Sequence, residues 1–424
     1  MRNAERGVLV GIVVAVGLAL RLGFVLEAVV QHPLRADAGQ YASYAKNLCE
    51  HGVFSLATTS PPAPDSFRSP GYPAVLAVCR GLFGEAGWQA GVVGLQVLLG
   101  ALTVLLAYRI ARACAGFAPA LVAAALTALS PHLVVSTAYV LTECVTTFVV
   151  LLAVWLAVGA TGRARLVTAA LVAGGAVLCN EALVVLPFAI GLAMWRASRG
   201  RALAFVALAL VPFVLWNVRN QVQPLAKSGS ERVTASISHG SYPGMVFRDP
   251  RLVGFPYRED PEQPAFGANW QGLRTVLAAR VAAEPWRYLS WYAVEKPLWL
   301  WRWSLVQGND VNVYEVANSP YESQFVMQAT HTLCWLLHVP VMLLGALTAV
   351  VALWRRRREN WALRALAGVA LLGTLAYLPV IPDPRYLQPI RPLVFVLAAA
   401  GGAAAVAFVA RRWRARETAA LAPA

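Results

Sequence analysis

Ten long apolar runs cross this 424-residue sequence, and they restrict its fold more than any other feature. A transmembrane helix needs about 20 mostly apolar residues, and most of these runs come near that length. Hydrophobic residues make up 58% of the chain and charged residues only 13%, too few to cover a soluble surface. We therefore expect an all-α polytopic membrane protein with about ten spans (the short runs beside Asn180 could instead form a hairpin that does not fully cross). The expected spans are 7–30, 88–108, 117–135, 139–160, 164–179, 182–195, 202–217, 326–354, 362–381 and 386–410.

The basic residues gather on one side of these spans. The net charge of +15 and the pI near 10.0 would suggest nucleic-acid binding in a soluble protein. Here the excess follows the positive-inside rule, under which Lys and Arg collect in cytoplasmic loops. We therefore expect both termini in the cytoplasm, a retained first span rather than a cleaved signal peptide, and no nucleic-acid partner. The basic residues of this side are Arg2, Arg6, Arg109, Arg112, Arg163, Arg165, Arg196, Arg199, Arg201, Arg355 to Arg358, Arg364, Arg411, Arg412, Arg414 and Arg416.

Two segments on the opposite, outer side are too long and polar to be simple connections. The first, 31–87, follows the first span, and the second, 218–325, contains most of the remaining charges. The sequence thus predicts three parts. They are an N-terminal membrane module (1–217) that includes the first outer loop, an outer region (218–325), and C-terminal spans with a basic cytoplasmic tail (326–424).

The first outer segment is expected to contain two short helices. Residues 37–50 are amphipathic, because Tyr41 and Tyr44 recur with other apolar residues at helical spacing. Asp37 stands at the start of this helix, where a carboxylate can cap the first amides and interacts favourably with the helix dipole. Residues 70–83 begin with Pro-Gly-Tyr-Pro and are too short to span a bilayer. We expect both helices to lie flat on the outer membrane surface.

The second outer segment contains a cluster of aromatic residues. Such a belt is typical of chain that lies among lipid headgroups, and a platform for stacking a sugar is the alternative. Lys296 lies inside the belt, where a charge is costly unless it is paired or used. The turn 382–386 places Arg385 and Tyr386 on the same outer side. The aromatic residues of the belt are Trp286, Tyr288, Trp291, Tyr292, Trp299, Trp301 and Trp303.

Neither the cysteines nor the histidines form a metal-binding pattern. The six cysteines show no CxxC spacing and lie mostly in or beside apolar runs, so we interpret them as small buried hydrophobic residues. The six histidines show no ligand spacing either. The sequence therefore predicts no metal centre.

Four motifs, in order and on the outer side, point to a known family. They are Asp37 with Tyr41 and Tyr44, then Phe67-Arg68-Ser69-Pro70-Gly71-Tyr72-Pro73, then Leu141-Thr142-Glu143 at the start of a span, and Pro384-Arg385-Tyr386-Leu387-Gln388-Pro389 before the last span. This set resembles the membrane-embedded GT-C glycosyltransferases that use polyprenyl-phosphate sugars, among them protein O-mannosyltransferases and lipid A aminoarabinose transferases. The resemblance covers most of 7–411 and is clearest over 31–160.

The resemblance implies a transferase that acts at the periplasmic face of the bacterial inner membrane. The donor would be a polyprenyl-phosphate (undecaprenyl-phosphate) sugar, and the acceptor a hydroxyl of an envelope lipid such as lipopolysaccharide, of a glycan or of a protein. By their place in the family's motifs, Asp37 would be the catalytic base, Glu143 a second catalytic carboxylate, and Arg68 a ligand of the donor phosphate. Ala38 stands where O-mannosyltransferases have the second acid of an Asp-Glu pair, so the acceptor is left open.

The chemistry of such a donor determines which groups are needed. A lipid phosphate is already a good leaving group, so transfer needs one base rather than a glycosidase's pair of carboxylates. Fixed cations must stabilise the departing phosphate, and the candidates are Arg68, Arg385 and Lys296. A single displacement predicts inversion at the anomeric carbon, and without a DxD spacing after Asp37 we expect no requirement for a divalent metal or other cofactor. Aromatic residues expected to line this site are Tyr41, Tyr72 and Tyr386.

These assignments make spatial predictions. Asp37 and Glu143 should lie close together, and Arg68, Arg385 and Lys296 should converge on one anion. Arg391, one turn into the last span, should instead pair within the bundle. Each candidate also has a structural alternative, such as a helix cap, a structural ion pair or an interfacial arginine.

A transporter or flippase of lipids or small molecules is the alternative function. Such a protein would place charged groups in the middle of the membrane and would show inverted repeats with broken helices. The charges of this chain gather instead at the ends of the apolar runs, and no repeat is visible. The sequence therefore favours the transferase, although it names neither the sugar nor the acceptor.

Overall fold

The computed structural model describes residues 3–246, 269–305, 314–355 and 361–420, where nearly all regular structure is helical. The helices of the first half are α1 (Asn3–Glu27), α2 (Asp37–His51), α3 (Gly71–Ala115), α4 (Phe117–Leu129), α5 (Pro131–Val135), η1 (Ser136–Ala138), α6 (Thr142–Val158), α7 (Arg163–Cys179), η2 (Glu181–Val184), α8 (Val185–Met194) and α9 (Arg199–Val222). Those of the second half are α10 (Gly229–Gly240), η3 (Pro243–Met245), α12 (Trp270–Ala283), α13 (Pro285–Ser290), η4 (Trp291–Glu295), α14 (Lys296–Trp301), α15 (Pro320–Ser323), α16 (Phe325–Trp354), α17 (Trp361–Tyr377), η6 (Pro384–Ile390) and α18 (Arg391–Ala420). Two short strands are β1 (Val29–Val30) and β2 (Val316–Ala317).

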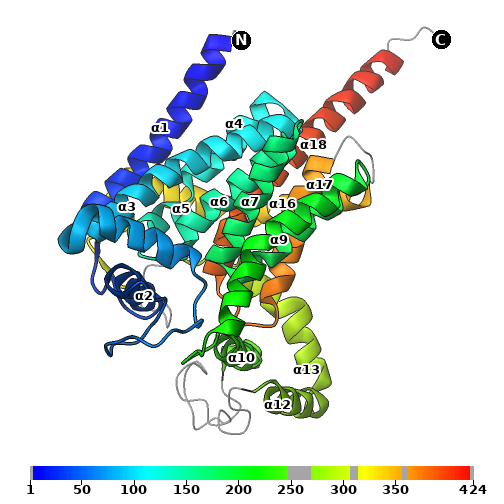
Figure 1. Cartoon of the computed structure of the whole chain (residues 1–424). Coiled ribbons are helices and arrows are strands. Elements are labelled where there is room, and N and C mark those ends of the chain that lie inside the picture. The colour runs from blue at the N-terminus through cyan, green and yellow to red at the C-terminus, as the bar shows by residue number, and fades with distance from the viewer. Residues whose placement is uncertain (1–2, 247–268, 306–313, 356–360, 421–424) are drawn as a thin grey trace.

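The long helices form one bundle with two different ends. The N-terminus of α1 and the C-terminus of α18 lie at the same end, whereas α2, α10, α12 and α13 lie at the opposite end (Figure 1). We call the latter the site end. The loop that precedes η6 and the starts of α6 and α18 also lie towards this end, because α18 runs from there to the C-terminus (Figure 1).

The predicted all-α membrane fold is confirmed, whereas the number of spans stays a prediction. Among the described residues, five helical segments are long and apolar enough to cross a membrane, namely α1, α3, α9, α16 and the continuous η6–α18 segment. The pair formed by α4 with α5 and η1, bent by 54°, would be a sixth span. Shorter apolar helices cover Thr142–Val158, Glu181–Met194 and Trp361–Tyr377. Every expected span therefore overlaps a helix, but several are shorter than a bilayer requires by length alone.

Small residues allow the helices of the bundle to pack closely. Ala107 of α3, Ala123 of α4, Ala153 of α6 and Ala170 of α7 are each fully buried in one continuous core. Alanine at such positions brings backbones near one another, which favours dispersion contacts between helices that have no hydrophobic driving force in lipid. The core holds rigid the helix ends that carry the polar residues described below.

The two helices expected in the first outer segment are both present. α2 covers the predicted amphipathic range, and it ends at Gly52, which adopts the left-handed conformation (φ 67°) common at helix C-termini. The second helix and the following span are both part of α3, but they are two helices that meet at a kink. Gly84 has non-helical φ 68° and ψ −177° there, one residue after the predicted end at Phe83.

A short β-ladder is the feature that the all-α prediction missed. Val29 and Val30 pair in antiparallel register with Ala317 and Val316. The Gln31 N–H extends the ladder by donating to the carbonyl of Glu315 (2.9 Å). The ladder therefore ties the end of α1 to the chain that enters α15 and α16, and it joins the two polar segments of the site end.

Candidate active site

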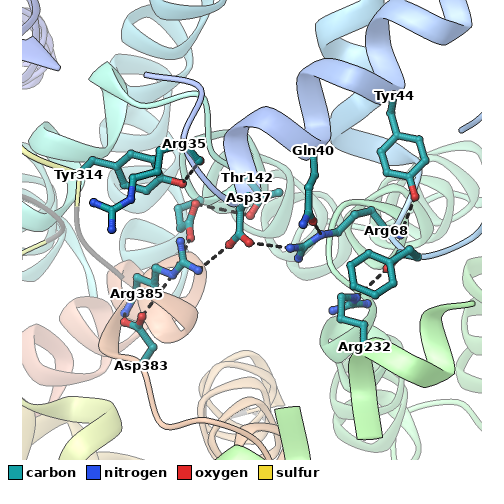
Figure 2. A network of polar contacts seen from close by, with 12 residues as sticks. Arg35, Asp37, Gln40, Tyr44, Arg68, Thr142, Arg232, Tyr314, Asp383 and Arg385 are labelled. Atoms are coloured by element: carbon teal, nitrogen blue, oxygen red, sulfur yellow. Dashed lines mark hydrogen bonds and ion pairs between the residues drawn. The ribbon is translucent and has the colours of Figure 1, made fainter. Parts of the chain in front are cut away.

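Asp37 is the centre of a cluster of charged side chains at the site end. It is the first residue of α2, and its Oδ1 accepts a hydrogen bond from Arg68 Nη2 at 2.6 Å. Its Oδ2 accepts from Arg385 Nη2 at 2.7 Å, so one carboxylate is held between two guanidinium groups (Figure 2). Arg68 lies 31 residues and Arg385 348 residues further along the chain, and the fold brings them together.

Arg385 lies among three carboxylates. Besides its bond to Asp37, its Nε lies 3.3 Å from Asp383 Oδ2 and 3.8 Å from Glu143 Oε1 (Figure 2). Asp383 also accepts the backbone N–H of Arg385 (3.0 Å), which caps η6 and fixes the position at which Arg385 leaves the chain. The Arg385 side chain is only 9% exposed, so burial makes these ion pairs stronger than surface pairs would be.

Arg68 is held on its other side by α2. Its Nε donates to Gln40 Oε1 at 2.6 Å, and the guanidinium carbon lies 5.4 Å from the ring centre of Tyr41. The backbone N–H of Arg68 donates to the hydroxyl of Tyr44 (3.3 Å; Figure 2), and this hydroxyl donates in turn to Asp65. The first turns of α2 therefore fix both the side chain and the backbone of Arg68.

The cluster around Asp37 borders a cavity of about 320 Å³. Asp37, Arg68 and Arg385 line it together. An ion pair between Arg232 Nη2 and Glu181 Oε2 at 2.9 Å also lines it, and Arg232 Nε donates to the carbonyl of Phe67 (2.8 Å), next to Arg68. The remaining polar or aromatic lining residues are Tyr41, Ser69, Thr142, Glu143, Asn180, Ser236, Tyr377 and Tyr386.

An aromatic face lies beside the charged residues. The rings of Tyr377 and Tyr386 stack with centroids 5.2 Å apart and an interplanar angle of 19°. The guanidinium carbon of Arg385 lies 5.3 Å from the ring centre of Tyr386. The amide of Asn180 donates to the Tyr377 hydroxyl at 2.7 Å, which fixes that ring. The cavity thus offers charged groups and, next to them, an aromatic face with hydrogen-bonding groups.

The arginines determine the ionisation of Asp37. Burial alone would raise the pKa of its carboxyl, but Arg385 and Arg68 outweigh burial and hold this pKa well below its usual value. Burial raises the pKa of Asp383, although Arg385 opposes that effect. Asp37 is therefore ionised at neutral pH, and it balances part of the positive charge of the two guanidinium groups.

The structure brings together most of the residues that the sequence singled out. Asp37, Glu143, Arg68 and Arg385 all line the cavity, and so do Tyr41 and Tyr386. Asp37 and Glu143 both contact the same guanidinium group, as expected from their predicted proximity. Their catalytic roles stay predictions.

Lys296 does not line the cavity, so the expected convergence of three cations was wrong in this respect. Its Nζ is buried and donates to the carbonyls of Leu378 (2.6 Å) and Val380 (2.9 Å), behind the loop that leads to η6. Burial lowers the pKa of Lys296 to about 6. A neutral amine has two N–H groups, which matches the two carbonyls, and it is poorly suited to bind phosphate.

Tyr72 was also misplaced as a lining residue. Its side chain is fully buried, its hydroxyl donates to Gln96 Oε1 (3.2 Å), and its ring packs edge-on against Tyr41. The Pro-Gly-Tyr-Pro motif therefore supports the cavity from behind. The motif of the resemblance predicted that Tyr72 lies near the site, but a motif does not tell which side of the helix faces the cavity.

Several lining residues were missed from the sequence. Asn180 and Glu181 form the turn between α7 and η2, and two polar residues between apolar runs were the available signal. Arg232 lies in α10, within a polar segment where nothing distinguished it from other arginines. Asp383, which contacts Arg385 but does not line the cavity, stands in the turn 382–386 already noted. Among the described residues, no group of His, Cys, Asp and Glu is arranged to hold a metal, and independence from metal stays a prediction.

Comparison with known proteins identifies the fold. Residues 67–217 match the family model of dolichyl-phosphate-mannose-protein mannosyltransferases, which is less than half of the chain. No match is found among curated protein sequences. The oligosaccharyltransferase AglB from Archaeoglobus fulgidus, solved with an inhibitory peptide and a dolichol-phosphate, has a TM-score of 0.51 and 13% identity, with 99% of this chain and 52% of that chain covered. The chain has a GT-C fold.

Two further structures extend this comparison. The same oligosaccharyltransferase tethered to an acceptor peptide gives a TM-score of 0.53 at 14% identity and covers 94% of this chain and 49% of that one. ArnT from Cupriavidus metallidurans, solved bound to undecaprenyl phosphate, has a TM-score of 0.39 at 16% identity, with 95% of this chain and 78% of that chain covered. A TM-score this low does not show a common fold. The GT-C chain described here spans about half the length of the AglB chains, and identities this low relate the folds alone.

Proposed function

We propose that this protein is an inverting membrane glycosyltransferase that moves a sugar from a polyprenyl phosphate to an acceptor hydroxyl. One observation carries the proposal: Arg68 and Arg385, from distant parts of the chain, meet on Asp37 in an open cavity. The GT-C fold supports it, as does the dolichol-phosphate in the structure of AglB. The acceptor is a lipid, glycan or protein of the cell envelope.

In this proposal the donor phosphate binds to the two arginines. Guanidinium groups bind phosphate oxygens in a planar, bidentate manner, and the two groups point towards each other across Asp37. When the phosphate arrives, it competes with Asp37 for the same N–H donors and releases one edge of the carboxylate. The arginines then stabilise the charge that develops on the phosphate as it leaves.

Asp37 is the proposed base, with Glu143 as the second carboxylate. The acceptor oxygen attacks the anomeric carbon from the side opposite the phosphate, and the bond between that carbon and the phosphate oxygen breaks with its electron pair on the phosphate. The acceptor proton passes to the carboxylate, which is ionised at neutral pH. Glu143 contacts the same guanidinium group as Asp37, so its negative charge offsets part of the positive charge of Arg385 beside the base.

The part of the cavity lined by Tyr377, Tyr386, Glu181 and Arg232 is the proposed sugar site. Sugars bind well where an aromatic face stands beside hydrogen-bonding groups, and Tyr377 and Tyr386 provide the face. Glu181 and Arg232 are each 28% exposed and can bond to sugar hydroxyls. The volume of about 320 Å³ is at the lower end of the range for ligand pockets, which favours a single sugar over an oligosaccharide.

The cavity is proposed to open on the periplasmic side of the bacterial inner membrane. The arginine-rich connections Arg109 to Arg112, Arg163 to Arg165 and Arg196 to Arg201 join helices at the end opposite the cavity, and the positive-inside rule assigns that end to the cytoplasm. A transporter is less well supported, because the charged groups of the cavity stand at helix ends rather than in the middle of spans.

A transfer assay tests the proposal. Purified protein in lipid nanodiscs is incubated with undecaprenyl-phosphate sugars labelled in the sugar, together with envelope lipid, glycan or protein acceptors. We expect label in the acceptor with inverted anomeric configuration, and none with Asp37→Asn. Transfer from nucleotide sugars but not from lipid-phosphate sugars would contradict the proposed donor.

A further inference from the structure

Arg391 is a buried cation for which the described residues provide no ion-pair partner. It is the first residue of α18 and only 1% exposed. Its Nε and Nη2 have no hydrogen-bond partner in the described part of the chain. The expectation that Arg391 pairs within the bundle was therefore wrong. Burying an unpaired charge at membrane depth costs free energy unless an opposite charge binds to it. Such a residue therefore indicates a functional site with an anionic ligand.

Two other arginines show how guanidinium groups are bound within this protein. Arg21 of α1 is fully buried, and its two Nη atoms donate to the carbonyls of Gly17 (2.7 Å), Ala128 and Thr127 (both 3.4 Å), whereas its Nε has no partner among the described residues. Arg68 fills the edge formed by its Nε and Nη2 with Gln40 and Asp37. The same edge of Arg391 is empty, and this edge presents two parallel N–H groups to a bidentate anion.

A second cavity lies beside this empty edge. It has a volume of about 20 Å³ and is lined by Arg391, His132, His338, Trp303 and Ser130 together with apolar residues of α4, α16 and α18. The Nε2 of His132 is also buried without a partner among the described residues, whereas Nε2 of His338 bonds the carbonyl of Trp301 at 2.8 Å. Within the described part of the chain, no acidic residue lines the cavity. Nitrogen atoms of two residues, each without a partner there, therefore border one small space.

The surroundings of the cavity indicate the kind of anion. One of its walls is α16, whose membrane-crossing window is only 11% buried in the protein. Leu333, Leu336 and Leu343 of this helix are about half exposed or more, with exposed fractions of 46%, 60% and 65%. A space of about 20 Å³ admits a group the size of a water molecule, such as a single phosphate oxygen, while the rest of a headgroup stays at the mouth.

We propose that this cavity binds the phosphate group of a membrane lipid. A non-bridging oxygen accepts from the Nε and Nη2 edge of Arg391 and from Nε2 of His132, and the apolar chains lie along the exposed face of α16. The site is separate from the Asp37 cavity, whose lining residues it does not share. The inference does not depend on the proposed transferase activity.

Lipid titration of the delipidated protein tests the site. The probes are phosphatidylglycerol, a diacylglycerol that lacks phosphate, and inorganic phosphate, and the readouts are the binding constant and the Tm. Arg391→Met is compared with the wild type and with Arg412→Met, which removes a charge from the exposed far end of the same helix. We expect phosphatidylglycerol to raise the Tm of the wild type and of Arg412→Met. Arg391→Met should bind it roughly tenfold more weakly or worse, the scale of losing a charge-assisted contact.

The Tm of the lipid-free protein provides a second, independent test. Without lipid, Arg391→Met should have a higher Tm than the wild type, because methionine removes an unpaired buried charge. A lower Tm together with an unchanged lipid response would overturn the site in favour of a structural role. Equal binding of diacylglycerol would exclude the phosphate as the recognised group, and an equal Tm increase with inorganic phosphate would exclude a lipid as its carrier.

Discussion

At the scale of single residues, Arg385 connects more of the candidate site than any other side chain described above. Arg385→Ala and Arg68→Ala should each weaken use of the lipid-phosphate donor by roughly 2 kcal/mol or more, because a charge-assisted contact to the phosphate is lost. The measurement is kcat/KM for the donor, with Arg287→Ala on the exposed side of α13 as the control. Full activity in either cavity variant would remove that arginine from the donor site.

Asp37→Asn tests the base directly. Asparagine keeps the shape of the side chain but cannot take a proton, and no cap is lost, because α2 has no side-chain capping hydrogen bond and the expected cap by Asp37 is not formed. We expect turnover to fall by about 100-fold or more while the protein still purifies as a folded species. Glu143→Gln is the matched comparison, because both carboxylates contact Arg385. If Glu143→Gln abolished transfer and Asp37→Asn spared it, the base would be Glu143.

Lys296 gives a pH-dependent prediction. Its pKa is lowered to about 6 by burial, whereas a lysine in the unfolded chain has a pKa of about 10. Between these values the unfolded chain binds one more proton than the folded protein, so the contribution of Lys296 to stability rises with pH from about 6 to 10. The Tm of the wild type should therefore increase from pH 6 to pH 8 by more than that of Lys296→Met. Equal changes in both proteins would show that Lys296 does not titrate in this window.

The residues of the site could be predicted from the sequence only where they belong to a motif on the outer side of the predicted spans. Asp37, Arg68 and Arg385 stand in polar motifs next to apolar runs, and the fold brings them into contact. Lys296 also stands beside apolar residues, but its amine bonds the carbonyl of Leu378 and does not reach the cavity. The direction of a side chain depends on tertiary packing, which sequence spacing does not show. Arg232 was missed for the converse reason, since its role depends on the placement of α10.

At the scale of elements, the start of α3 depends on Gly71. A Cβ on this residue would lie 2.7 Å from the backbone of Leu178 and Cys179, so α3 contacts the end of α7 directly. Gly71→Ala should destabilise the protein by about 1–3 kcal/mol through overpacking, and it should also reduce activity because Arg68 and Asn180 flank the contact. The denaturation midpoint provides the measurement. Gly81→Ala, in the same helix with no atom within 4 Å of the added Cβ, is the control, and equal midpoints for both variants would contradict the close approach.

The elements themselves were the most predictable part of the fold. Apolar length predicted each long helix, and the spacing of Tyr41 and Tyr44 predicted α2. The β1–β2 ladder gave no signal, because two residues are too few for an alternating pattern. The predicted end of the short helix at Phe83 agrees with the kink at Gly84, where a glycine within an apolar run takes a non-helical conformation.

At the scale of the whole molecule, the orientation in the membrane can be tested with native cysteines. Cys49 is exposed on α2 at the site end, and Cys114 lies at the opposite end, near the C-terminus of α3. In single-cysteine variants, a membrane-impermeant maleimide should label Cys49 in cells with a permeabilised outer membrane and an intact inner membrane. Cys114 should react only after the inner membrane is opened. The reverse pattern would place the Asp37 cavity in the cytoplasm.

The segment η6 has a consequence for the molecule as a whole. It begins beside Arg385, which reaches the Asp37 cavity, and it ends at Arg391, which lines the second cavity. Gln388 bonds the carbonyl of His132, so the segment is also fixed to the wall of the second cavity. If a ligand in each cavity shifts η6, the two binding equilibria are thermodynamically linked. The factor by which the first ligand changes the affinity for the second is then the same as the factor by which the second changes the affinity for the first.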